Sequence, residues 1–95
     1  MSEKKEQPKI LNYKGKPLVR NGNVICYGDV KSDKYILILE IKQTKMENDR
    51  EIATKVLVLI KSMEEDAFVK YTEKDSLYEA FELGEIWIDG FLREG

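Results

Sequence analysis

The chain has 95 residues, a formal net charge of −2, one cysteine and no histidine, with 42% hydrophobic and 36% charged residues. This composition predicts one folded domain with a single core, and the absence of histidine excludes a serine triad, a Cys–His dyad and a structural zinc site as these are usually built. Cys26 alone cannot form an internal disulfide, and no run approaches the ~18 apolar residues of a membrane span, so we expect a cytoplasmic protein without membrane contact.

The first third of the chain predicts a tail followed by short strands. Residues 1–8 are polar and end at Pro8, so we expect a flexible tail there and a single α+β domain over residues 9–95. Strand-like segments follow at 10–13, 17–20 and 24–27. Between the last two lies Asn21-Gly22, and both residue types tolerate the positive φ of a tight turn, which predicts a hairpin.

Two long apolar runs, at 35–41 and 56–60, are the strongest signal in the sequence. They predict two longer strands over 34–44 and 51–63, joined by a tip near Asn48, and a last strand is predicted over 67–71. The centres of the long strands are apolar on both faces. One face is therefore expected to pack on a helix and the other on a curled sheet or on a partner.

After Thr72 the apolar period changes from two to about three and a half, which predicts an amphipathic C-terminal helix. Gly84 has two interpretations. It could end the helix before a strand over 85–89, or it could lie in the apolar stripe, where a small residue permits close approach to a sheet. We favour the continuous helix. The predicted fold class is α+β: an antiparallel β-meander of five to six strands, able to curl into a partial barrel, packed by one C-terminal α-helix.

A flank of this helix is a candidate interface. With the apolar stripe assigned to the sheet, Leu83, Ile86 and Trp87 lie on a side that the stripe does not cover. Adjacent exposed apolar residues mark interfaces, so we expect a protein partner or a homodimer here. The alternative is that the sheet curls far enough to cover Leu83 and Trp87 and leaves only Ile86 outside.

No catalytic, cofactor-binding or metal-binding residue is predicted. The carboxylates at 47–51 and 64–66 lack the spacing of a calcium loop and are interpreted as solvated loop tips. Lys61-Ser62 could be a nucleophile pair only if burial depressed the pKa of the amine. Cys26 is expected to be a buried, inert residue. The early tyrosines lack the signature of RNA-binding sheets, so nucleic acid is not an expected partner.

The segments Leu11-Asn-Tyr-Lys-Gly-Lys-Pro-Leu-Val-Arg20, Tyr27-Gly28 and Leu77-Tyr78-Glu79-Ala80 together resemble small uncharacterised bacterial proteins of about this length. This resemblance implies no activity and no functional residue. The order of elements is also similar to that of pleckstrin-homology-like small barrels, which is an analogy of architecture only.

The leading functional hypothesis is a non-enzymatic cytoplasmic interaction or assembly domain, without a cofactor. The alternative is a small-molecule binding domain, with an apolar pocket between sheet and helix lined by Trp87 and the tyrosines. A third hypothesis is a small enzyme that uses carboxylates or a lysine.

Overall fold

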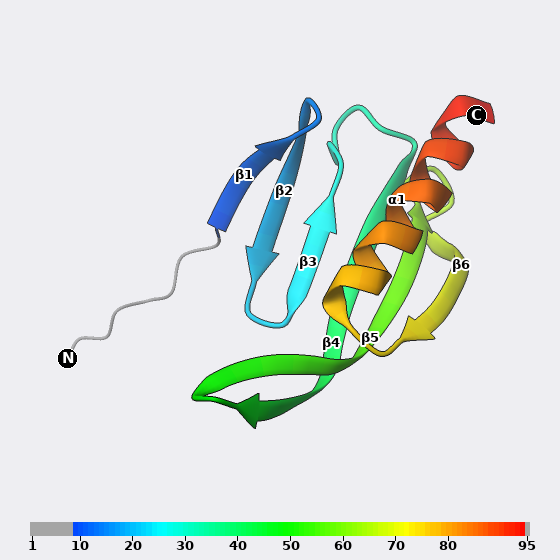
Figure 1. Ribbon diagram of the computed structural model, residues 1–95. Helices are drawn as coiled ribbons and strands as arrows, with labels where there is room; N and C mark the ends of the chain where they lie inside the picture. The colour runs from blue at the N-terminus through cyan, green and yellow to red at the C-terminus, as the bar shows by residue number, and fades with distance from the viewer. Residues whose placement is uncertain (1–8, 95) are drawn as a thin grey trace.

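Six strands form one antiparallel meander, and one helix packs across it (Figure 1). This computed structural model describes residues 9–94, so the predicted tail lies outside the described residues. The elements are β1 (Lys9–Tyr13), β2 (Lys16–Asn21), β3 (Val24–Tyr27), β4 (Tyr35–Glu47), β5 (Arg50–Ser62), β6 (Ala67–Lys74) and α1 (Leu77–Glu94). The strand order in the sheet is the order in the chain, and the sheet is open, not closed into a barrel. The predicted α+β meander is confirmed.

Two-residue turns set the register of three hairpins. Asn48 and Asp49 join β4 to β5 with φ of 52° and 64°. Two successive positive φ angles define a type I′ turn, whose twist matches that of the flanking strands. Lys14 and Gly15 join β1 to β2 in the same way, with φ of 51° and 80°. The predicted tip near Asn48 is confirmed.

The hairpin between β2 and β3 forms as predicted, but its turn lies one residue later than Asn21-Gly22. Asn21 still pairs with Val24, so the two turn residues are Gly22 and Asn23. Gly22 has a φ of 67°, and Asn23 is not among the positive-φ residues. A positive φ at the first position alone is the pattern of a type II′ turn, which requires glycine there.

The hydrophobic core lies between one face of the sheet and α1. Residues two apart on a strand share a face, so one face of β3, β4 and β5 carries the buried set. The core consists of Ile25, Tyr27, Leu37, Leu39, Ile41, Val56, Val58 and Ile60 from the sheet, with Ala80 and Ile88 from the helix. The alternation places every second residue of these strands on the opposite face, away from α1.

The helix is continuous through Gly84, as predicted, and Gly84 is its point of closest approach to the sheet. A Cβ atom at this position would lie 2.5 Å from Leu37 Cδ1 and 2.7 Å from Leu37 Cδ2. Leu37, the third residue of β4, is fully buried and has little room to move. A glycine is therefore required for α1 to rest on β4 at this distance.

The β4–β5 hairpin bends where it leaves the core. Lys42 falls at a register shift between Ile41 and Gln43, which is a β-bulge, and bulges increase local twist. Asn23, in the β2–β3 turn, makes two hydrogen bonds to Ile41, just before the bulge. Its Nδ2 donates to the Ile41 carbonyl at 3.1 Å, and its backbone carbonyl accepts the Ile41 N–H at 2.8 Å. The outer half of the hairpin then passes below that turn (Figure 1).

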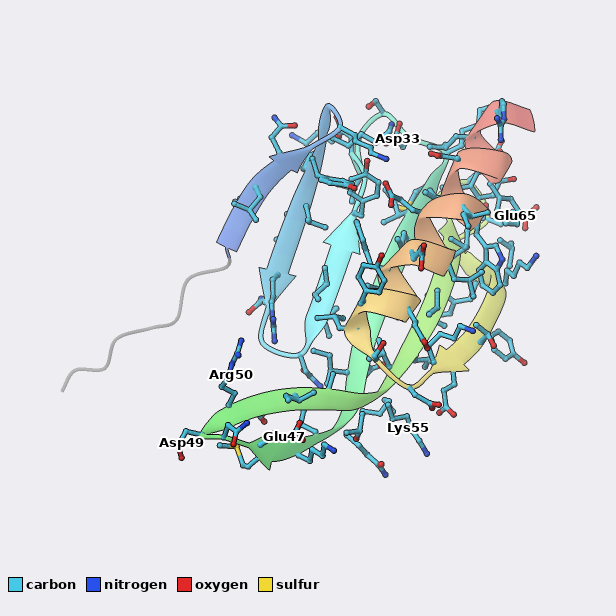
Figure 2. The ribbon with its side chains drawn as sticks, in the orientation of Figure 1. Asp33, Glu47, Asp49, Arg50, Lys55 and Glu65 are labelled. Carbon is cyan, nitrogen blue, oxygen red and sulfur yellow. The ribbon has the colours of Figure 1, made fainter. Side chains whose placement is uncertain are left out.

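The loop between β3 and β4 is closed by Asp33, which lies beside the β1–β2 turn (Figure 2). Its carboxylate accepts hydrogen bonds from Lys16 Nζ at 2.9 and 3.0 Å and from the Asp29 N–H at 2.9 Å. Burial alone would raise the pKa of this carboxyl. The Asp29 and Lys16 hydrogen bonds outweigh burial and hold the pKa below its ordinary value of 3.8.

Replacing Gly84 by alanine should lower the free energy of unfolding by roughly 1–3 kcal/mol, because the new methyl overlaps Leu37. Gly90→Ala is the matched control, since Gly90 lies on the same helix with no atom within 4 Å of its Cβ position. That control should raise stability by up to about 1 kcal/mol through helix propensity. Urea denaturation measures both. Equal responses of the two variants would contradict the close approach.

Replacing Asp33 by asparagine should lower the free energy of unfolding at neutral pH by about 1 kcal/mol, because a charge-assisted pair with Lys16 is lost. A depressed pKa contributes stability that is present above the unfolded value and is lost as pH falls through the folded value. In urea denaturation, parent and variant should therefore converge as the pH falls below the ordinary carboxyl pKa and through the lower folded-state pKa of Asp33. A difference that stays constant across this range would show that ionisation of Asp33 is irrelevant.

Candidate interaction surfaces

The carboxylates considered for catalysis or metal binding lie on exposed loop tips. Glu47 and Asp49 project from the far end of the β4–β5 hairpin beside Arg50, and Glu65 lies near the β5–β6 turn (Figure 2). Within residues 9–94, no group of three His, Cys, Asp or Glu side chains is placed to hold a metal ion. The carboxylates at these tips are therefore solvated surface charges.

Lys61 and Ser62 do not form a pair. As neighbours on β5 they point to opposite faces of the sheet. Lys61 Nζ lies 3.0 Å from the Asp66 carboxylate on the side away from the helix. Ser62 is buried, and its Oγ accepts the Glu65 N–H at 3.2 Å. The two side chains therefore cannot act on one substrate atom.

Cys26 is half-buried, so the prediction that it is buried was too strong. It lies on the face of β3 that does not meet α1, because it alternates with Ile25 and Tyr27, which are both in the core. Burial raises the pKa of the thiol, and the charge of Lys61 offsets this only in part. A raised pKa keeps the thiol protonated at neutral pH and weakens it as a nucleophile.

The predicted helix flank is only partly exposed. Ile86 is 64% exposed, while Leu83 and Trp87 are half-buried. Trp87 packs against the core, and Lys70 of β6 places its Nζ 4.6 Å from the centre of the Trp87 ring. This cation–π contact explains why Trp87 contributes less exposed surface than its position on the helix suggests. The arrangement is close to the alternative in which only Ile86 stays outside.

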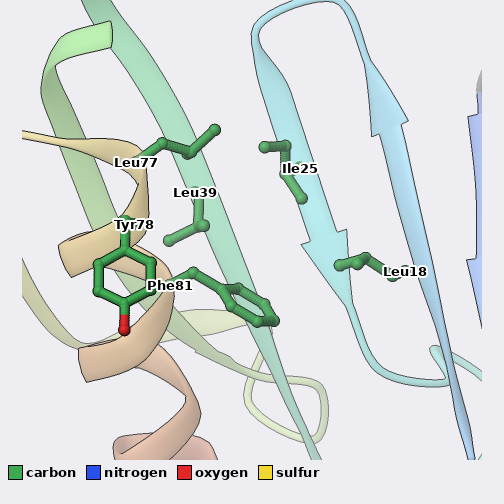
Figure 3. A pocket seen from close by; sticks show the side chains of 6 residues that line it. All are labelled: Leu18, Ile25, Leu39, Leu77, Tyr78 and Phe81. Carbon is green, nitrogen blue, oxygen red and sulfur yellow. The ribbon is translucent and has the colours of Figure 1, made fainter. Parts of the chain in front are cut away.

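An apolar cavity lies between the first turns of α1 and strands β2 to β4 (Figure 3). Its volume is about 320 Å³, and Tyr78, which is 77% exposed, is one of its lining residues. The lining residues are Leu18, Ile25, Leu39, Leu77, Tyr78 and Phe81. The sequence predicted a pocket between sheet and helix lined by Trp87 and the tyrosines. Of these, Tyr78 lines the cavity, whereas Trp87 and the early tyrosines do not.

An aromatic cluster borders this cavity. Tyr13 and Tyr27 from the sheet meet Phe81 of the helix edge to face, with ring centres 5.4 to 6.0 Å apart. The Tyr27 hydroxyl donates to the Tyr13 carbonyl at 3.0 Å. These rings bridge β1, β3 and α1, so they fill the gap beside the cavity.

The face of the sheet opposite α1 carries an apolar row that crosses all six strands. Strand register places one residue of each strand side by side, because each pairs with the next: Ile10 with Val19, Val19 with Cys26, Cys26 with Ile38, Ile38 with Leu59, and Leu59 with Tyr71. The four central members are half-buried, and Ile10 and Tyr71 at the ends are 68% and 71% exposed. We call this row the apolar row and the whole face the open face.

The rows on either side of the apolar row differ in charge. On one side, Lys61 is paired between Ile36 and Phe68. The loop after β3 covers Ile36, since Gly28 packs against its Cδ1, and Ile36 is 2% exposed. On the other side, the row reads Val24, Glu40, Leu57 and Glu73 from β3 to β6. The open face is therefore apolar along its middle, with Lys61, paired to Asp66, on one flank and with Glu73 and Glu40, the latter beside Lys42, on the other.

Sequence reasoning did not name the open face as a site. The signal was the absence of polar alternation in 35–41 and 56–60, which predicted an apolar second face and a cover of some kind. An antiparallel sheet with one face in water normally alternates apolar and polar residues. The row became visible only with the register of all six strands.

Comparison with protein-family models, with curated proteins and with solved structures finds no match for this chain. In the part of the chain that the structure describes, no helix is long and apolar enough to cross a membrane.

Proposed function

We propose that this chain is a non-enzymatic, cytoplasmic interaction domain that binds protein through the apolar surface its own helix leaves uncovered. The observation that carries this proposal is the apolar row of the open face, which runs from Ile10 on β1 to Tyr71 on β6. Contiguous exposed apolar patches larger than a few hundred Å² are rare on monomers and mark interaction sites. The single α-helix covers one face of the sheet, so the apolar row on the other face is left for a partner to cover.

The helix flank of Leu83, Ile86 and Trp87 is the second surface of this proposal. It is smaller, because Ile86 alone is mostly exposed. Isolated exposed apolar residues are common and need no partner. The open face is therefore the main contact surface of this proposal, and the helix flank is the smaller, secondary one.

Site-specific photo-crosslinking in the cells that make this protein tests the proposal. A benzophenone amino acid at Leu59, in the middle of the open face, should form protein adducts, and the same group at Ile86 tests the helix flank. Position Glu47, on the exposed tip of the β4–β5 hairpin, is the control and should form none. An absence of adducts from both Leu59 and Ile86 would contradict an interaction domain of this kind.

The cavity beside Phe81 supports a second candidate function, the binding of a small amphipathic molecule. The apolar cavity shares Leu77 with a more polar hollow of about 250 Å³, which is lined in part by Arg20, Asn23 and Thr44. Apolar pockets with a few polar groups at one end are typical ligand sites. An aliphatic chain would fill the apolar part and place its polar end near Arg20.

Titration with decanoic acid, followed by methyl NMR, tests this second function. Saturable shifts are expected at Leu18 and Leu39, which line the cavity. Leu18→Trp should abolish them, because the larger ring fills the space, whereas Ile86→Trp on the outside of the helix should not. Shifts that fail to saturate, or that survive Leu18→Trp, would exclude the cavity as a ligand site.

A further inference from the structure

We propose that the open face binds the open face of a second copy of this chain, with a two-fold axis along the apolar row. This inference rests on the proposed function, because it names the partner for that surface. It assigns a homodimer to the sheet and not to the helix flank.

The apolar row is suited to meet itself. A two-fold axis along the row places each of its members opposite the same residue of the other copy, so that Ile38 faces Ile38 and Leu59 faces Leu59. Six strands spaced by about 4.8 Å give a face about 24 Å wide. Two such faces packed about 10 Å apart form the core of a β-sandwich, in which both inner layers are apolar.

The charges beside the row favour this axis. Rotation about the row brings the flank that holds Lys61 onto the acidic flank of the other copy. Lys61 then faces Leu57, whose neighbours across the ladder are Glu40 and Glu73, each about 4.8 Å to the side. The same contact occurs twice, so each lysine lies between two carboxylates of its partner. Opposite charges that meet around an apolar centre fix orientation.

A different two-fold axis gives no such match. An axis parallel to the strands through the middle of the sheet would superpose β5 on β2 and place Lys61 over Pro17. Glu40 would then lie over Val24. Each charge would then be desolvated against an apolar residue and would gain no counter-ion from the other copy, which is unfavourable. The pattern of charge therefore selects the axis along the row.

The ion pairs within one chain leave these groups available. Asp66, which pairs with Lys61, is 85% exposed in its side chain, and Glu40 lies 3.7 Å from Lys42 at the surface. Exposed pairs of this kind stabilise a fold by little. Exchange of Asp66 for the partner's carboxylates consequently costs the fold little.

Sedimentation velocity from about 1 to about 500 µM, with charge reversals, tests the axis. The parent should be dimeric at the upper end. Lys61→Glu should raise the dimer dissociation constant about tenfold, since it faces two carboxylates. Adding Glu40→Lys and Glu73→Lys to the same chain should restore the dissociation constant of the parent. Asp66→Asn, which removes only the competing internal pair, should not raise the dissociation constant, and Ile86→Glu, on the helix flank, should leave that constant unchanged.

Cys26 provides a second measurement on the unaltered protein, because it is the one cysteine and lies in the apolar row. Its alkylation by iodoacetamide should slow as protein concentration rises through the dissociation constant. A parent that stays monomeric, a dimer weakened by Ile86→Glu and not by Lys61→Glu, or a triple variant without recovery would each overturn the inference. Crosslinks from Leu59 to another protein would then leave the proposed function standing, whereas no crosslinks would remove both.

Discussion

The contact of Gly84 with Leu37 is the constraint on which the remaining features depend. It seats α1 against β4, the fourth of six strands, and from there the helix covers β4 and β5 and reaches β6. The backbones of β2 and β3 lie farther from the helix, and only side chains span the gap. The rings of Tyr27 and Phe81 fill part of this gap, and the unfilled part is the apolar cavity. The position of one glycine thus decides where the molecule is filled and where it is hollow.

Local signals in the sequence were sufficient for the strands, the tips and the helix, because each depends on neighbours in the chain. The apolar runs at 35–41 and 56–60 fixed the long hairpin, and the stripe through Gly84 fixed the continuous helix. The β2–β3 turn moved by one residue because Asn21 pairs with Val24 and leaves Gly22 at the position that needs positive φ. Hairpin register depends on cross-strand pairing, which a turn motif alone does not specify.

The candidate surfaces were harder to predict, because exposure depends on elements distant in the chain. Trp87 was assigned to an exposed flank, but Lys70 of β6 reaches over its ring. The register of β6 against β5 shifts between Ile60 and Lys61, and this irregularity has no signature in the sequence. Cys26 was expected inside the core. Its neighbours Ile25 and Tyr27 are inside, and the pleat turns Cys26 to the other face. The sequence could show that both faces of the long strands were apolar, but not which face the helix would take.

An apolar sheet face is a hazard unless something limits what it binds, because flat apolar surfaces associate with many others. The flanking rows provide that limit here. Glu40 and Glu73 on one flank and Lys61 on the other would be desolvated by an apolar partner that brings no counter-ion of its own. Only a surface with the reverse charge order can cover the apolar row without this penalty. The open face of a second copy, related by a two-fold axis along the apolar row, presents this reverse order. The charges that disfavour other partners therefore favour a second copy.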